Sequence, residues 1–169
     1  MNTPFIAILM GSQSDLNVMQ HAADTLKGFG IPYEINILSA HRSPEQTKQY
    51  VEEASQRGAQ AFIAAAGLAA HLAGAVAAHT IKPVIGVPLD AGTLGGLDAL
   101  LSTVQMPGGM PVATTAIGKP GAVNAATLAA QIMALHDSRI FSALQQARAK
   151  KLQSILSSNE SLHKEQIAE

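Results

Sequence analysis

The sequence predicts one α/β domain built on a parallel, doubly wound sheet of five strands. Three observations lead to this fold class. The chain has 169 residues, which suits a single domain. Short apolar runs alternate with amphipathic segments, and turn or capping residues separate the two. Repeated strand–helix units require right-handed crossovers between parallel strands, and five strands in this length favour the order 2-1-3-4-5. In such sheets ligands bind at the carboxyl ends of the strands.

The first strand–helix unit opens the chain. Residues 5–10 form an apolar run that predicts a strand, and the GSQSD segment after it begins a helix. Gly28 and Gly30 end that helix. Its buried face is predicted from apolar residues at helical spacing, namely Met19, Ala22, Ala23, Leu26 and Phe29.

The second unit pairs a strand at residues 33–38 with a helix that ends near Arg57. Ser43 is the expected N-cap of this helix, and Pro44 occupies its first helical position. Gln46 lies three residues after the cap, so the pattern predicts a capping box.

No charged residue lies between Arg57 and Lys82, and an apolar stretch of this length raises the question of a membrane span. The stretch is rich in alanine and is interrupted by glycines and histidines. A buried strand at residues 61–66 followed by an alanine-rich helix at residues 68–79 is the better interpretation. We therefore expect no membrane segment.

The remaining chain predicts strands at residues 83–87 and 112–117 and helices at residues 94–104 and 121–135. A final helix begins at Asp137 or Ser138. We expect it to pack on a neighbouring subunit through an apolar stripe formed by Ile140, Leu144, Ala147, Leu152 and Ile155. Residues 1–157 are assigned to a single catalytic domain, and residues 158–169 are expected to form a polar, disordered tail.

Composition excludes several classes of function. With 11 basic and 12 acidic residues the net charge is −1, which removes the basic field that nucleic-acid binding needs. Cysteine is absent, so the chain holds no disulfide, thiolate zinc site or cysteine nucleophile. The first residues lack the features of a signal peptide, and we expect a cytoplasmic protein. The 30 alanines and 14 glycines bury little apolar area each, so further burial between subunits of a homo-oligomer is predicted.

The loop after the first strand, residues 11–15, offers a phosphate site. Gly11 lets a ligand approach the backbone, while Ser12 and Ser14 add hydroxyl donors beside a helix N-terminus. Asp15 repels phosphate but can accept hydrogen bonds from a ribose diol. The alternative is a helix cap, with Ser14 or Asp15 closing the turn.

The loop after the second strand, residues 39–44, holds the strongest chemical signal. Arg42 is a candidate phosphate ligand because of its forked guanidinium, and Ser39 and Ser43 can donate beside it. His41 is the best candidate for acid–base chemistry, since imidazole titrates near neutral pH. The alternative is a surface loop with an exposed histidine and arginine.

The loop after the third strand, residues 67–74, provides small side chains, backbone amides and His71. Such walls suit a small neutral molecule. His71 by itself is open to another interpretation, a satisfied histidine of the core. The histidines of the chain are scattered and no carboxylate pair accompanies them, so we expect no metal site.

Six segments carry a resemblance when taken together: GSQSD (11–15), SAHRSP (39–44), AGLAAHLAG (66–74), PVIGVPL (83–89), STVQMPGGMPV (102–112) and AIGKPGAVNAA (116–126). In this order the chain resembles the N5-carboxyaminoimidazole ribonucleotide mutases of purine biosynthesis. The resemblance implies a flavodoxin-like fold, a homo-octamer and a reaction without ATP, metal or organic cofactor. The reaction moves a carboxylate from the exocyclic nitrogen to carbon 4 of an aminoimidazole ribonucleotide. It also implies a functional partnership with an ATP-dependent synthetase that makes the substrate.

The resemblance also implies residue roles. His41 is the proton-transfer residue, and the other matched positions bind the substrate. Ser12, Asp15 and Arg42 hold the ribonucleotide, and Ser14, Ser39 and Ala40 lie beside them; Gly67, Ala70 and His71 line the pocket for the carboxylate and carbon dioxide. The chain departs from the family pattern at Leu68, where a glycine is expected, and at Ala73, where a proline is expected.

Two alternatives stay open at this point. One is direct carboxylation of aminoimidazole ribonucleotide by free carbon dioxide, since the two activities share ligand residues. The other is a non-catalytic nucleotide-binding module. A phosphorylated receiver domain needs an acidic cluster that the sequence lacks, and a flavin protein needs more aromatic residues than two Tyr and no Trp.

Overall fold

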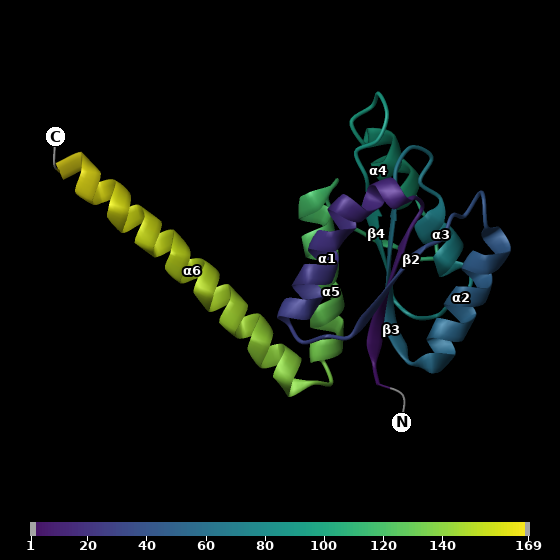
Figure 1. The fold of residues 1–169 in the computed structure, drawn as a ribbon, viewed down its shortest axis with the longest axis horizontal. Coiled ribbons are helices and arrows are strands. Elements are labelled where there is room, and N and C mark those ends of the chain that lie inside the picture. The colour runs from purple at the N-terminus through teal and green to yellow at the C-terminus, as the bar shows by residue number, and fades with distance from the viewer. Residues whose placement is uncertain (1–2, 168–169) are drawn as a thin grey trace.

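A computed structural model describes residues 3–167 of the chain. Five parallel strands form one sheet in the order β2-β1-β3-β4-β5, which confirms the predicted flavodoxin-like arrangement (Figure 1). The strands are β1 (Phe5–Met10), β2 (Tyr33–Ile37), β3 (Ala59–Ala66), β4 (Val84–Pro88) and β5 (Ala113–Thr114). The chain reverses its direction of winding between β2 and β3, on either side of β1, so the loops after these strands meet at a ligand-binding edge.

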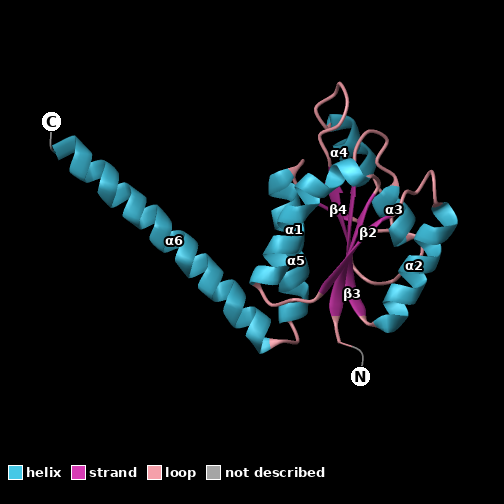
Figure 2. Ribbon diagram, in the orientation of Figure 1, coloured by secondary structure: helices cyan, strands magenta, loops and turns pink. Residues whose placement is uncertain are grey.

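Helices cover both faces of the sheet. They are α1 (Leu16–Gly28), α2 (Pro44–Arg57), α3 (Leu72–Ala77), α4 (Leu97–Val104), α5 (Lys119–Ala134) and α6 (Ser138–Ile167), and a 3₁₀ turn, η1 (Gln13–Asp15), precedes α1. Helices α1 and α5 lie on one face, while α2 and α3 lie on the other (Figure 2). The side chains of β1 alternate between these two layers, with Ile6 and Ile8 in one apolar cluster and Ala7 and Leu9 in the other. Both faces of the central strand are therefore buried, as in other parallel sheets.

The buried face predicted for the first helix is confirmed. Met19, Ala22, Ala23 and Leu26 are all buried against the sheet and α5, while Phe29 packs at the edge of the same cluster. The predicted capping box at Ser43 is wrong. Ser43 does begin α2, but its hydroxyl turns back to the backbone of Ser39 instead of capping the helix.

Two helices begin later than their sequence pattern predicts, and left-handed residues explain both differences. Helix α3 begins at Leu72 instead of residue 68, because Leu68 has a φ of +55° that no right-handed helix accommodates. Helix α4 begins at Leu97 instead of residue 94, because Gly95 and Gly96 have φ values of +57° and +80°.

Helix α6 leaves the body of the domain as a long rod (Figure 1). Ile140 is buried and Leu144 packs against the core, whereas Leu152 and Ile155 of the predicted stripe are each 58% exposed. The expected boundary at residue 157 does not appear, because α6 continues to Ile167. The segment contains no glycine or proline that would stop the helix. Residues 168–169 of the expected tail lie outside the described residues. Despite the length of α6, no helix within residues 3–167 is apolar enough over a sufficient length to cross a membrane.

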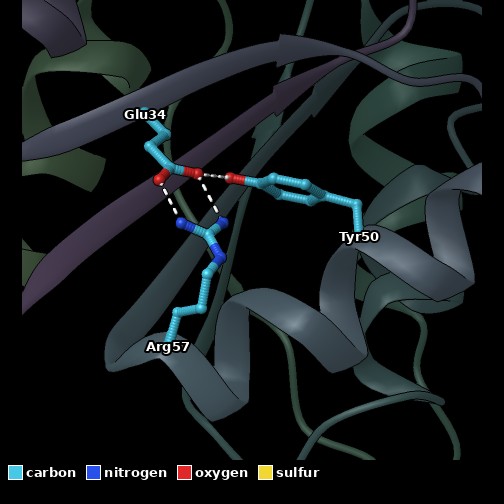
Figure 3. A network of polar contacts seen from close by, with 3 residues as sticks. All are labelled: Glu34, Tyr50 and Arg57. Carbon is cyan, nitrogen blue, oxygen red and sulfur yellow. Dashed lines mark hydrogen bonds and ion pairs between the residues drawn. The ribbon is translucent and has the colours of Figure 1, made fainter. Parts of the chain in front are cut away.

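A polar network ties β2 to α2 at the amino edge of the sheet (Figure 3). The guanidinium of Arg57 donates to both carboxylate oxygens of Glu34, with Nη2 at 2.8 Å from Oε2, and the Tyr50 hydroxyl donates to the same Oε2 at 2.8 Å. Arg57 also lies over the Phe5 ring, 5.1 Å from its centroid. The hydrogen bonds from Arg57 hold the pKa of Glu34 below its usual value.

We expect Glu34→Gln to lower the free energy of unfolding at neutral pH by about 1 kcal/mol or less, because the ion pair is partly exposed. The depressed pKa of Glu34 means that its contribution is present above the pKa of an unfolded-chain glutamate and is lost as pH falls through the folded value. Urea unfolding at neutral and acid pH measures this difference, with exposed Glu52→Gln as the control. A difference between Glu34→Gln and wild type that does not shrink in acid contradicts the assignment.

Candidate functional site

The loops that follow the first four strands enclose a cavity of about 580 Å³ at the carboxyl edge of the sheet. Its lining includes most of the residues expected from the sequence. They are Ser12, Ser14 and Asp15 after β1, Ser39, Ala40, His41 and Arg42 after β2, and Gly67 and His71 after β3. The lining also includes Gly11, which the sequence placed at the phosphate site, and Leu68, where the chain departs from the family pattern. The lining residues that the sequence did not single out are Ala66, Ala69, Leu72 and Ala91. The topology brings together side chains that are far apart in the sequence.

The first loop forms a helix cap and also lines the cavity. Ser12 is the N-cap of η1, and its backbone N–H donates to Asp15 Oδ2 at 2.9 Å in a capping box. The Ser14 hydroxyl donates to Ser12 Oγ at 3.0 Å. The cap therefore belongs to Ser12, and it is the cap itself that orients Asp15 and both serine hydroxyls at the cavity.

Asp15 is half-buried, and this desolvation raises the pKa of its carboxyl above the usual value. Hydrogen bonds from Ser12, Ser14 and Gly11 and the charge of Arg42 act in the opposite direction but are smaller. Relative to the unfolded chain, the folded state therefore disfavours the ionised form of the Asp15 carboxyl. A half-buried carboxyl group with a shifted pKa at the wall of a cavity is typical of a functional site.

We expect Asp15→Asn to raise the free energy of unfolding at pH 7 and to weaken ribonucleotide binding. The raised pKa means that ionised Asp15 destabilises the folded chain above that pKa, and the neutral amide removes this effect while it keeps an acceptor for the Ser12 N–H. Thermal unfolding and ligand titration measure the two changes. Asp24→Asn on α1, away from the cavity, is the matched control, and a variant that loses stability contradicts the electrostatic argument.

The second loop is a compact turn that aims Arg42 at the first loop. The Ser39 N–H donates to Ser43 Oγ at 2.9 Å, and the Arg42 N–H donates to Ser39 Oγ at 3.2 Å. Arg42 Nη2 donates to the carbonyl oxygen of Gly11 at 2.8 Å. One of the five guanidinium N–H groups thus joins the two loops, and the others stay available for an anion.

His41 and His71 meet across the cavity. Nε2 of His41 lies 2.6 Å from Nδ1 of His71, and the rings are perpendicular with centroids 4.8 Å apart. One ring must donate and the other accept, so the two nitrogens share one proton. The interpretation of His71 as a core histidine is wrong, because its side chain is exposed at the rim of the cavity.

The third loop contributes small walls, but not at every expected position. Gly67 lies so close to the loop after β4 that a Cβ there would come within 2.6 Å of the Ala91 Cβ. Ala70 is only 2% exposed and lies outside the cavity lining, unlike the expectation for it. Within residues 3–167 no group of three metal-binding side chains comes together. The site offers one guanidinium, one carboxylate and a pair of imidazoles for binding and proton transfer.

Comparison with known proteins identifies the relatives of this chain. Residues 5–154 match the family model described as AIR carboxylase. A Bacillus subtilis protein named N5-carboxyaminoimidazole ribonucleotide mutase is 50% identical over 159 residues, which is 94% of this chain and 98% of that protein. The Escherichia coli K12 protein of the same name is 46% identical and covers 92% of each chain. The crystal structure of Treponema denticola PurE superposes with a TM-score of 0.85 at 32% identity, over 94% of this chain and 98% of that one. The chain belongs to the AIR carboxylase family.

Proposed function

We propose that this protein is an isomerase of purine biosynthesis that converts N5-carboxyaminoimidazole ribonucleotide into 4-carboxy-5-aminoimidazole ribonucleotide. The contact between His41 and His71 at the rim of a small-walled cavity is the observation that carries the proposal. The relatives named for this reaction, which share about half of their residues with the chain, support it. A proton-transfer pair next to a phosphate-binding guanidinium fits a ribonucleotide whose exocyclic nitrogen must gain one proton and whose carbon 4 must lose one.

The first two loops bind the ribonucleotide. Arg42 and the hydroxyls of Ser12, Ser14 and Ser39 hold the phosphate, and Asp15 accepts hydrogen bonds from the ribose hydroxyls. These contacts are remote from the reacting ring. Their binding energy positions the imidazole between Ala40, Gly67 and the two histidines.

The reaction balances in protons, so one acid–base pair is sufficient. In the first half the bond between the exocyclic nitrogen and the carboxylate breaks, carbon dioxide leaves, and the nitrogen keeps the electron pair and takes a proton from His41. In the second half carbon 4 of the ring attacks carbon dioxide and forms the new bond between carbons. The proton on carbon 4 then returns to His41, and His71 holds the partner end of the shared hydrogen bond. No external acid, base or energy source is consumed.

An assay of the purified protein without ATP tests the proposal. We expect rapid formation of the 4-carboxy product from N5-carboxyaminoimidazole ribonucleotide, and little from aminoimidazole ribonucleotide at low bicarbonate. Efficient turnover of the second substrate at low bicarbonate would make this chain a direct carboxylase. Binding of the product without turnover in either reaction would make it a nucleotide-binding module.

We further propose that the chain forms a homo-octamer in which α6 packs on a neighbouring copy. Leu135, Phe141, Leu152 and Ile155 are each more than half exposed in one subunit. A second cavity of about 370 Å³ lies between α5 and α6 and is lined largely by apolar side chains. The core of small residues supports the same conclusion, since burial between subunits adds the stability that such a core lacks.

Light scattering at micromolar concentration should give a mass eight times that of the 17.5-kDa chain. We expect the double substitution Leu152→Glu and Ile155→Glu to lower this mass, because it places charges on the exposed stripe. Lys150→Glu, on the opposite side of the same helix, is the control. A monomeric wild type excludes the octamer.

The substrate class supports two further proposals. The carbamate of N5-carboxyaminoimidazole ribonucleotide forms from an amine and bicarbonate in an unfavourable equilibrium, which supports supply of the substrate by an ATP-dependent synthetase. A phosphorylated ribonucleotide does not cross a membrane unaided, which supports a cytoplasmic location. Coupled turnover with such a synthetase and cell fractionation test these two proposals.

A further inference from the structure

The hydroxyl of Ser43 makes its hydrogen bonds within its own loop instead of offering them to a ligand. Its O–H donates to the carbonyl oxygen of Ser39 at 3.2 Å, and its oxygen accepts from the Ser39 N–H at 2.9 Å. A hydroxyl has one proton to donate, so the loop uses the only one. Ser43 also lies outside the cavity lining, unlike Ser39 and Arg42. The sequence placed Ser43 beside Arg42 as a donor to phosphate, and the structure gives its hydroxyl a different partner.

Three hydrogen bonds join the two ends of the loop between β2 and α2. Besides the two bonds of the Ser43 hydroxyl, the Ser43 N–H donates to the carbonyl oxygen of Ser39 at 2.9 Å. Within the loop, the Arg42 N–H donates to Ser39 Oγ at 3.2 Å. The backbone that carries His41 and Arg42 is thus closed on itself at Ser39 and Ser43.

Both ends of this closed loop are fixed to the body of the domain. On one side, the Leu38 N–H donates to the carbonyl oxygen of Met10 at 2.8 Å and continues the pairing of β2 with β1. On the other side, the Ser43 carbonyl oxygen accepts from the Thr47 N–H at 3.0 Å and from the Thr47 hydroxyl at 2.9 Å. Thr47 is only 1% exposed. Ser43 therefore connects the loop to a buried residue of α2.

The side chains of His41 and Arg42 depend on this backbone for their positions. Both are exposed, so packing in the core does not hold them. His41 nevertheless reaches Nδ1 of His71 at 2.6 Å, and Arg42 reaches the carbonyl oxygen of Gly11 at 2.8 Å. Contacts of this length between separate loops require that each loop keeps one conformation.

We propose that Ser43 is a positioning residue whose hydroxyl closes the loop that presents His41 to the reacting ring and Arg42 to the phosphate. This inference rests on the proposed function. Ser43 acts through its two neighbours and touches no reacting atom. A displacement of a reacting group by about 1 Å can lower the rate about a hundredfold, so a loop that carries both an acid–base group and a phosphate ligand gains from being closed.

Ser43→Ala and Ser43→Thr test this role. We expect Ser43→Ala to lower kcat with N5-carboxyaminoimidazole ribonucleotide and to weaken binding of the 4-carboxy product, each by about tenfold or more. Deuterium exchange, measured by mass spectrometry on residues 39–43, should be faster in Ser43→Ala because the Ser39 N–H loses its partner. Threonine keeps the hydroxyl, so Ser43→Thr should restore the wild-type values of kcat, affinity and exchange.

Ser55→Ala on the same helix is the matched control. The Ser55 hydroxyl donates to the carbonyl oxygen of Val51 at 2.7 Å, outside the cavity lining. We expect this variant to leave kcat, product affinity and the exchange of residues 39–43 unchanged. The Ser43 side chain makes no capping bond to α2, so urea unfolding should show no larger loss of stability in Ser43→Ala than in Ser55→Ala.

The measurements distinguish positioning from other roles of Ser43. Weaker product binding with unchanged kcat and unchanged exchange would make Ser43 a phosphate ligand and overturn the proposal. Wild-type kcat and affinity despite faster exchange would also overturn it, because His41 and Arg42 then keep their positions in an open loop. Failure of Ser43→Thr to restore activity would separate the effect from the hydroxyl and contradict the proposal. If wild type forms no product, the proposed function fails, while product affinity and exchange in the same variants still decide whether Ser43 sets the loop.

Discussion

Replacement of His41 by asparagine should lower turnover by about three orders of magnitude while the ribonucleotide still binds. Asparagine keeps a polar side chain of similar size at the cavity but can neither give a proton to the exocyclic nitrogen nor take one from carbon 4. In the proposed binding mode the phosphate and ribose contacts lie on Arg42, Asp15 and the serines, which all line the cavity, so the dissociation constant should change little. Steady-state assays and product titration measure the two quantities. Near-normal turnover would remove His41 from proton transfer.

Two further variants provide a control for His41→Asn and a test of whether the two imidazoles act together. His136→Asn changes an exposed histidine beyond α5 and should leave turnover unchanged. His71→Asn removes the partner at 2.6 Å, and the double variant should lose little more than His41→Asn alone, because residues that act as one unit are not additive. Losses that multiply in the double variant would show that the two imidazoles act independently.

Arg42→Lys should weaken product binding by about tenfold to a hundredfold even though the charge is kept. The guanidinium has enough donors to bind the Gly11 carbonyl oxygen at 2.8 Å and an anion at the same time. The ammonium of lysine is a single point charge and cannot span both partners. The substitution therefore loses the fork to the phosphate and the tie between the first two loops. Calorimetric titration with the 4-carboxy product measures the change.

Arg148→Lys is the matched control, because Arg148 is an exposed arginine on α6 outside the site cavity. Affinity should also fall less steeply with salt in Arg42→Ala than in wild type if the guanidinium contacts phosphate. Unchanged affinity in both Arg42 variants would place the phosphate elsewhere.

Much of the site could be predicted because it follows from topology and local chemistry. Once the alternation of strands and helices indicated the order 2-1-3-4-5, the ends of β1, β2 and β3 had to meet, and the polar residues there are few. Ser12, Asp15, His41 and Arg42 were therefore accessible from the sequence. Ala91 follows β4 at the same edge, and an equal application of that rule would have found it.

The rest depends on backbone conformations that a pattern of residue types does not reveal. The GLAAH segment has the composition of a helix start, but the left-handed Leu68 delays α3 and turns Ala70 into the core instead of the cavity. The hydrogen bond between His41 and His71 joins positions 30 residues apart, and it depends on the distance between two loops. A long polar segment such as residues 158–167 carries no stop signal, so composition alone does not distinguish an extended helix from a disordered tail.

The position of the Glu34–Arg57–Tyr50 network affects how the sequence of such a protein can evolve. The network lies near the start of β2, where Glu34 is about 10 Å of strand from Ile37, and His41 and Arg42 lie in the loop beyond the end of the strand. Substitutions at the two ends share no contacts, so their effects on folding and on turnover should add independently. Stability gained at the amino edge can then offset a destabilising change among the catalytic loops, and new loop sequences become accessible without loss of the fold.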